Sequence, residues 1–270
     1  MDSRPIGVFD SGLGGLTAVR QLRRIMPSEH IIYFGDTSRV PYGNRSADTI
    51  LKYARQDLRF LRSFDLKAAV IACGTVSSNC LGTLQQENDI PIVGVVEPAV
   101  RRAAAMTENR RVGLIATRAS VSSGAYQRLF RRDHPDIALF AKACPLFVPL
   151  VEEGRFRPGD VVIETVAAEY LAELKERGVD TLVLGCTHYP LLEDVIAGEM
   201  GGGVSLVDVG CESAYEIKRQ LKSMDRLAPE GAGHVDYYAS DRPADFQRLA
   251  ASFLREDLEE QVHPVDIEKY

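Results

Sequence analysis

Short apolar runs alternate with helical patterns along almost the whole chain, and this alternation constrains the fold most. We predict strands over 5–12, 30–36, 67–73, 90–96, 112–117, 137–144, 181–186, 204–210 and 234–240. Helical patterns lie between most of these runs. Strands that alternate with helices are typical of parallel sheets. The sequence therefore predicts an α/β fold with mainly parallel sheets.

The clearest helical patterns span 16–27, 46–64, 160–178 and 243–254. Ser46 is a suitable N-cap for the second, and basic residues followed by Gly178 end the third. So many strands in 270 residues fit two modest sheets better than one. We expect a first domain from residues 1–96 with 208–270 and a second from 97–207, with 95–100 as the crossover and the tail packed on the first half.

Two cysteines occupy matching places in this pattern. Cys73 in "VIACGTVSSN" and Cys186 in "LVLGCTHYP" each end an apolar run. Asp10 and Thr117 end the first strand of each half at comparable distances upstream. Ligands in open α/β sheets lie beyond the carboxyl ends of the strands. The chain thus has an internal pseudo-repeat of pattern, which predicts two thiols on opposite sides of one cleft between two pseudo-symmetric domains.

A single cysteine beside a strand is usually a small buried hydrophobe, and Cys80, Cys144 and Cys211 keep that interpretation. Cys73 and Cys186 differ because hydroxyl residues follow them and a helix is expected next. A helix N-terminus favours the thiolate and binds anions. A metal site is poorly supported, because Cys186 and His188 lack further ligands at recognisable spacings.

Composition narrows the class of protein. The net charge is −6 with pI near 5.5, and no basic run is long enough to indicate nucleic-acid binding. Five cysteines, an odd number without CxxC spacing, favour reduced thiols in the cytoplasm over a disulfide scaffold. No apolar stretch approaches the roughly 20 residues that a membrane-spanning helix needs.

Three further segments have both a structural and a functional interpretation. "FDSGLGG" (9–15) is a strand-to-helix turn that would let a ligand approach the backbone, without the GxGxxG spacing of nucleotide sites. "SRVPYGNRS" (38–46) is either a structural turn or a ligand-contacting lid carrying Tyr42. "VPLVEEG" (148–154) places Glu152 and Glu153 at a turn, where glutamates are usually just solvated. His188 is close enough to Cys186 to relay its proton.

Five blocks together resemble the glutamate racemases, cofactor-independent enzymes of the aspartate/glutamate racemase superfamily. In chain order they are "GVFDSGLGGLTAVR", "VPYGNRS", "CGTVSSN", "CPLFVPLVEEG" and "LGCTHYPLL". The resemblance implies two α/β domains around the active site and interconversion of L- and D-glutamate by two bases, without metal or other cofactor. It also implies a cytoplasmic homodimer that supplies D-glutamate for peptidoglycan and so for cell wall biogenesis and cell shape.

The resemblance also implies residue roles. Cys73 and Cys186 match the two catalytic thiols, with Cys73 serving D-glutamate and Cys186 serving L-glutamate. Asp10 and His188 match the residues that assist each thiol, and Glu152 matches a further acidic helper. The positions that match substrate contacts are Asp10, Ser11, Tyr42, Gly43, Gly74, Thr75, Thr117, Ser120, Thr187 and His188.

The chain departs from the family pattern at two of these positions. Gly74 stands where the family commonly has Asn, so one side-chain contact to the substrate is missing. Ser120 stands where a Thr is expected, which keeps a hydroxyl. We expect altered affinity rather than lost activity. Two alternatives stay open: an aspartate or hydantoin substrate, and an amino-acid binding protein whose thiols are redox or structural groups.

Overall fold

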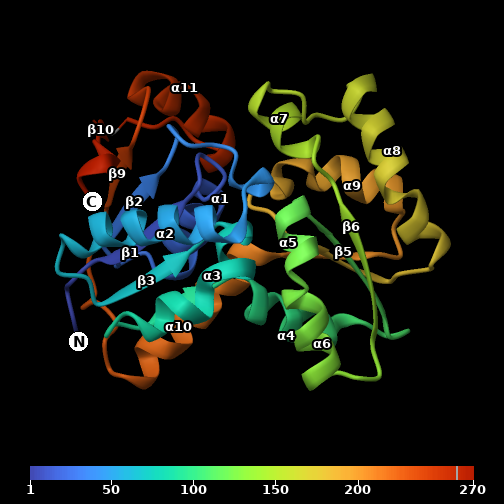
Figure 1. The fold of residues 1–270 in the computed structure, drawn as a ribbon, viewed down its shortest axis with the longest axis horizontal. Coiled ribbons are helices and arrows are strands. Elements are labelled where there is room, and N and C mark those ends of the chain that lie inside the picture. Colours follow the sequence, from blue (N-terminus) through green and yellow to red (C-terminus); the bar gives the residue numbers. More distant parts are fainter. Residues whose placement is uncertain (260) are drawn as a thin grey trace.

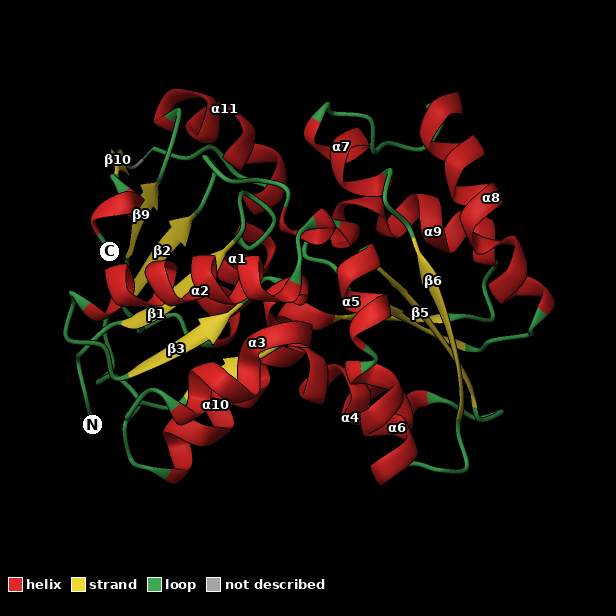
Figure 2. Ribbon diagram, in the orientation of Figure 1, coloured by secondary structure: helices red, strands yellow, loops and turns green. Residues whose placement is uncertain are grey.

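The computed structural model describes residues 1–259 and 261–270, and in them two parallel sheets are flanked by helices (Figures 1 and 2). The first sheet has six strands in the order β10-β9-β2-β1-β3-β4. The bounds of these strands are β1 Ile6–Asp10, β2 Ile31–Gly35, β3 Ala68–Ile71, β4 Ile92–Gly94, β9 Val235–Ala239 and β10 Val262–Pro264. Every pairing recorded between them is parallel, which confirms the predicted α/β class.

The second sheet has four strands in the order β6-β5-β7-β8, and these are also parallel. Their bounds are β5 Arg111–Ala116, β6 Ala138–Ala143, β7 Thr181–Leu184 and β8 Ser205–Asp208. This order repeats the order β2-β1-β3-β4 of the first sheet. In both sheets, the strand that comes first in the sequence lies between the second and the third. The pseudo-repeat read from the sequence is thus present in the topology.

The α-helices and three short 3₁₀ segments connect the strands. The α-helices are α1 Leu16–Ile25, α2 Ala47–Arg62, α3 Gly74–Gln86, α4 Val96–Met106, α5 Arg118–Ser123, α6 Ala125–Asp133, α7 Phe147–Glu152, α8 Val161–Glu176, α9 Glu193–Met200, α10 Val209–Ser223 and α11 Pro243–Leu254. The 3₁₀ segments are η1 Tyr42–Asn44, η2 Tyr189–Leu192 and η3 Ile267–Lys269. No helix among the described residues is both long and apolar enough to cross a membrane.

Helix ends follow the local chemistry of the sequence. Ser46 caps α2 as predicted, since its hydroxyl accepts the Thr49 N–H. Asp160 and Asp208 cap α8 and α10 in the same way. Gly178 follows α8 with φ of +65°, the left-handed conformation that glycine adopts without steric cost. Capping side chains and glycine therefore set these boundaries.

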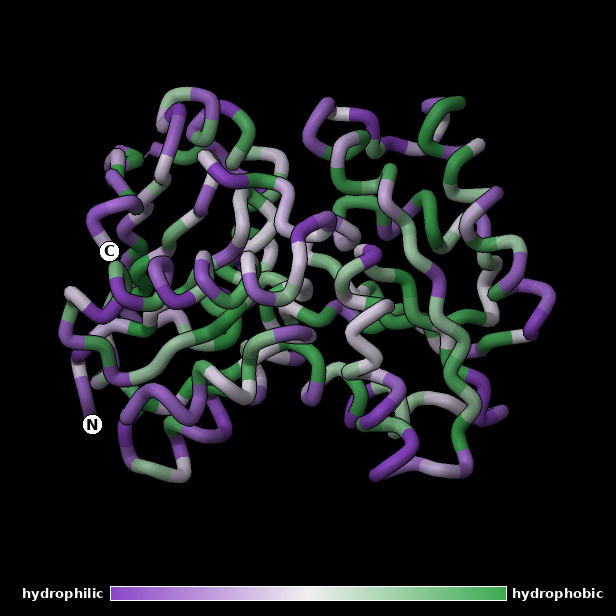
Figure 3. Tube along the Cα trace, viewed as in Figure 1, coloured by the Kyte–Doolittle hydropathy of each residue, from purple (hydrophilic) through white to green (hydrophobic). Residues whose placement is uncertain are grey.

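Hydrophobic and hydrophilic stretches alternate along the trace (Figure 3), and the buried apolar residues form clusters on the sheets and the helices that cover them. One apolar cluster joins the two halves, because it contains Val8 of β1, Leu182 of β7 and Phe253 of α11. β9 pairs with β2, and the chain ends beside the six-stranded sheet (Figure 1). The prediction that the tail packs on the first half is confirmed.

The predicted crossover 95–100 contains the start of α4, so this segment is helical. Two local predictions differ from the structure. Glu152 is the last residue of α7 instead of lying in a turn. Residues 147–152 form this short helix, whose Phe147 and Val151 side chains are buried. Cys186 is followed by a turn and the 3₁₀ segment η2, not directly by an α-helix.

Candidate active site

Cys73 and Cys186 line one cavity at the carboxyl ends of the two sheets. Each lies two residues beyond a strand, Cys73 after β3 and Cys186 after β7. The cavity has a volume of about 240 Å³, and both thiols are nearly buried, with exposed fractions of 4% and 6%. The prediction that the two thiols face a shared cleft is confirmed, because matching strand ends of the two sheets meet here.

Cys73 is the thiol of the first half and the N-cap position of α3. Its Sγ lies 3.4 Å from the Ser11 hydroxyl oxygen, within hydrogen-bond range. Burial, reinforced by the nearby charge of Asp10, raises the pKa of Cys73 to about 12. Cys73 therefore carries its proton at neutral pH, and in this state it is an acid.

Cys186 is the thiol of the second half and belongs to a chain of polar contacts. Its Sγ lies 3.8 Å from His188 Nδ1, and His188 Nε2 lies 3.0 Å from Glu152 Oε1. Burial alone would lower the pKa of His188, but its contacts with Cys186 and Glu152 raise it to about 10. A protonated imidazole held by a carboxylate favours a negative sulfur beside it. His188 and Glu152, both site candidates of the sequence analysis, thus line the same cavity as the two thiols.

The ring of Phe253 packs edge-on against the His188 imidazole, with centroids 5.5 Å apart. Phe253 belongs to α11, so the tail contributes to the wall behind the second thiol. Sequence reasoning missed this residue. The apolar residues of the 243–254 segment have ordinary helical spacing, and this pattern does not indicate contact with a histidine 65 positions earlier.

The protonation of His188 makes the stability of the protein depend on pH. A pKa raised from 6.5 in the unfolded chain to about 10 in the folded one stabilises the fold fully below pH 6.5. That contribution is lost as pH rises towards 10. We therefore expect the free energy of unfolding to fall across this window, and His188→Gln to flatten the fall. Urea denaturation at several pH values would measure it; an unchanged slope in the variant would contradict the assignment.

Asp10 ends β1 but lies behind the cavity wall, with only 1% of its surface exposed. Its carboxylate accepts the Gly12 N–H at 3.0 Å and the Thr187 hydroxyl at 3.3 Å. Burial raises the pKa of Asp10. The side chain thus bridges the turn after β1 to the loop that follows Cys186, and it reaches the first thiol through the neighbouring Ser11.

Hydroxyl and backbone groups line the cavity between the thiols. The hydroxyls of Thr75 and Thr117 lie 3.0 Å apart and join the two halves. The other predicted contact residues that line the cavity are Ser11, Tyr42, Gly43, Gly74, Thr187 and His188. Ser120 does not line it: it is fully buried and its backbone N–H is capped by the Thr117 hydroxyl. Its own hydroxyl oxygen accepts a hydrogen bond from the Thr117 hydroxyl at 3.0 Å, so it is used inside the protein.

Gly74 lies against the second half of the molecule. A Cβ built at this position would come within 2.5 Å of the Gly185 carbonyl oxygen, a backbone atom that cannot move aside easily. Gly74 follows the first thiol and Gly185 precedes the second. An Asn side chain at this position would therefore have no room. The backbones at Gly74 and Gly185 approach each other closely instead, which brings the loops of the two thiols together.

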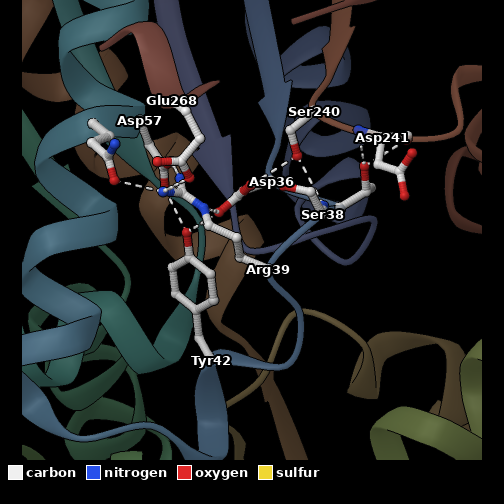
Figure 4. A network of polar contacts seen from close by, with 10 residues as sticks. Asp36, Ser38, Arg39, Tyr42, Asp57, Ser240, Asp241 and Glu268 are labelled. Carbon is white, nitrogen blue, oxygen red and sulfur yellow. Dashed lines mark hydrogen bonds and ion pairs between the residues drawn. The ribbon is translucent and has the colours of Figure 1, made fainter. Parts of the chain in front are cut away.

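Tyr42 lines the cavity while its hydroxyl points into a buried polar network (Figure 4). The hydroxyl contacts the carboxylates of Asp36 and Asp57. Arg39 donates to the same two carboxylates, at 2.6 and 2.8 Å, and to Gln56 at 2.6 Å. The loop 37–44 is thus fixed by a buried ion cluster, and only the aromatic body of Tyr42 is left for a ligand.

Replacement of Arg39 by Met should loosen this loop. It leaves the buried Asp36 and Asp57 without their cation, and breaking a buried pair in this way costs about 3–5 kcal/mol. We expect a matching loss in the free energy of unfolding, measured with urea. Arg45→Met, at the residue that follows this loop, is the control, because Arg45 is exposed. Equal stability of the two variants would disprove the anchoring role.

Several cavity residues were not predicted. Cys144 was assigned a structural role, yet it lines the cavity. It ends the strand candidate 137–144, so the rule that selected Cys73 and Cys186 could have found it. Arg118 also lines the cavity and offers a cation there. Further lining residues are Val40, Pro41, Asn44, Pro145, Val148 and Pro149.

Comparisons with known proteins agree with this geometry. The sequence model of the Asp/Glu/Hydantoin racemase family matches residues 16–213. A glutamate racemase of Geobacter metallireducens is 46% identical over 255 residues, which is 94% of each chain. The crystal structure of a glutamate racemase from Bacillus anthracis is 32% identical and superimposes with a TM-score of 0.93 over 98% of each chain.

A second crystal structure, of a glutamate racemase from Francisella tularensis in complex with D-glutamate, is 35% identical. It covers 100% of both chains with a TM-score of 0.92. The aligned region therefore includes both sheets. The chain therefore belongs to the Asp/Glu/Hydantoin racemase family, and within it to the glutamate racemases, which are isomerases.

Proposed function

We propose that this chain interconverts L- and D-glutamate by proton transfer at Cα between two thiols, without a cofactor. The observation that carries the proposal is the pair of thiols in one cavity with different surroundings. Cys73 is held as a thiol, whereas Cys186 lies beside a protonated His188. One group is therefore prepared to donate a proton and the other to accept one.

In the L-to-D direction, the Cys186 thiolate removes the Cα proton of L-glutamate and becomes a thiol. The Cys73 thiol then delivers its own proton to the opposite face of the carbanion and becomes a thiolate. The reverse direction exchanges the two roles. Two opposed groups are needed because one fixed group cannot serve both faces of a carbon that stays in place.

The carbanion must be stabilised by the site, since the Cα–H of an amino acid is a very weak acid. The N-terminal turn of α3 offers unpaired N–H groups at Gly74 and Thr75 to a carboxylate. Thr187 and Thr117 offer hydroxyls on the other side. Arg118 provides a cation within the same cavity, which suits the second carboxylate of a dicarboxylic amino acid.

Asp10 and Ser11 support the first thiol in this proposal, and His188 with Glu152 support the second. Asp10 acts by position, since it lies behind the cavity wall and is bonded to Gly12 and Thr187. Glu152 holds the protonated imidazole. The two pairs are equivalent in role but not in chemistry, because one is a carboxylate with a hydroxyl and the other is an imidazole with a carboxylate.

We also propose the domain boundaries that the pseudo-repeat implies, with residues 1–96 and 208–270 as one domain and 97–207 as the other. The segregation of the strands supports it, because each sheet draws its strands from one of these sets, apart from Asp208 at the end of β8. Family membership supports a homodimer that supplies D-glutamate to peptidoglycan. The five unpaired cysteines favour the reducing cytoplasm.

Incubation with L-glutamate in D₂O tests the reaction. We expect deuterium at Cα together with growing D-glutamate, followed by NMR and circular dichroism. L-aspartate in a parallel sample tests the substrate, and we expect turnover lower by at least about tenfold. Binding of glutamate without any deuterium at Cα would identify an amino-acid binding protein instead. Faster exchange of aspartate would reassign the substrate.

A further inference from the structure

A group of metal-ligating side chains lies at the amino end of the six-stranded sheet, at the opposite edge from the cavity. His30 directly precedes β2, His234 directly precedes β9, and Asp236 is the second residue of β9. No spacing in the sequence indicates the group, because His30 and Asp236 are 206 positions apart. Only the pairing of β2 with β9 brings them together.

Sheet geometry places the three side chains on one face. The register pairs Ile31 with Val235 and Ile32 with Asp236, so His30 stands beside His234. Side chains two residues apart on a strand share a face, which puts His234 and Asp236 on the same side. The burial pattern agrees, because Val235 and Tyr237 are buried on the other face while Asp236 is half-exposed.

The contacts match this placement. His30 Nε2 lies 2.8 Å from Asp236 Oδ2, and the rings of His30 and His234 are stacked with centroids 3.8 Å apart. One ligand atom from each residue lies within 4.8 Å of the other two. The side chains of His30 and Asp236 keep 25% and 39% of their surface exposed, so an ion can reach them.

We propose that His30, His234 and Asp236 bind a divalent transition metal such as Zn²⁺, with water completing its coordination. Two imidazole nitrogens and one carboxylate oxygen form a donor set that Zn²⁺, Co²⁺ and Ni²⁺ prefer, whereas Mg²⁺ and Ca²⁺ prefer oxygen alone. The ion would replace the hydrogen bond that now joins His30 to Asp236. It lies at the sheet edge remote from catalysis.

The bound ion would fasten the C-terminal part of the chain to the rest. Within the described part of the chain, β9 pairs with β2 and β10 alone, and residues 224–234 connect α10 to it. A metal shared by His30 and His234 ties β9 to β2 at the point where both strands begin. Because binding requires the folded pairing, metal raises the melting temperature.

Titration of the full-length protein with Co²⁺, followed by Zn²⁺ competition, tests the site. We expect visible d–d absorption of nitrogen- and oxygen-bound Co²⁺ and an increase in melting temperature with Zn²⁺. His234→Ala and Asp236→Asn should each weaken binding by at least about tenfold. Both variants should keep the racemase activity of the unchanged protein, which shows that they fold.

His263→Ala is the matched control, because His263 is an exposed histidine on β10 of the same sheet. It should bind as tightly as the unchanged protein. Sulfur-to-Co²⁺ charge-transfer absorption, or loss of binding on Cys73→Ala, would place the ion at the cavity thiols and overturn the proposal. Equal affinity of His234→Ala and the unchanged protein would overturn it as well.

Discussion

We expect Cys73→Ala and Cys186→Ala each to abolish racemisation, with a loss in kcat of at least about 10³–10⁴-fold. Both thiols line one cavity, and each is the only acid/base that the mechanism provides for its face of Cα. Positioned acid–base groups contribute about 10²–10⁴-fold each, and here removal leaves one proton transfer without any partner. Circular dichroism of glutamate solutions measures the rate directly.

The two variants should differ in the half-reaction that they retain. Cys73→Ala keeps Cys186, so it should exchange the Cα proton of L-glutamate in D₂O without forming D-glutamate. Cys186→Ala should do the same with D-glutamate only. This opposite selectivity reports the face that each thiol serves, which loss of activity alone does not.

Cys80→Ala is the control for these variants, since Cys80 is a buried thiol of α3 outside the cavity lining. It should retain activity within a few-fold of the unchanged protein. Substantial racemisation by either Cys73→Ala or Cys186→Ala would defeat the two-thiol mechanism. If one variant exchanged the Cα proton of both enantiomers, the proposed racemase reaction would stand, but the assignment of each thiol to one face of Cα would be wrong.

Gly74→Ala is expected to lower kcat by about 10²-fold. The new methyl group would meet the Gly185 carbonyl oxygen at 2.5 Å, so the first turn of α3 or the loop before Cys186 must move. A displacement of about 1 Å between reacting groups can cost that much in rate. The substitution acts on the distance between the thiols, so kcat should fall more than KM rises.

Gly82→Ala provides a matched control in the same helix. A Cβ at Gly82 meets nothing within 4 Å, and alanine in a helix interior is favoured over glycine by up to about 1 kcal/mol. It should keep full activity and raise stability slightly. Full activity in Gly74→Ala as well would mean that the two halves do not need this close approach for catalysis.

The sequence by itself determined the class of fold and singled out the two cysteines that share the cavity. Alternating apolar runs and helical patterns predicted parallel strands, because a parallel pair needs a crossover, usually a helix, on its face. Ser46 predicted a helix start because its hydroxyl satisfies a free backbone N–H of the first turn. The two strand-end cysteines predicted a shared cleft because carboxyl ends of parallel strands gather at one edge.

Only the tertiary structure decided which side chains surround these groups. Tyr42 turns its hydroxyl toward Asp57, Phe253 packs on His188, and Cys144 enters the cavity. Each depends on contacts between segments whose relative position no local pattern encodes.

Gly74 shows the difference most clearly. The sequence identified a missing side chain at this position, whereas the structure shows the backbone of Gly185 occupying its place. Local propensity and periodicity act over a few residues, and so they fix elements and their ends. The distance between the two sheets depends on packing between residues more than 100 positions apart in the sequence. These contacts exist only once the chain has folded.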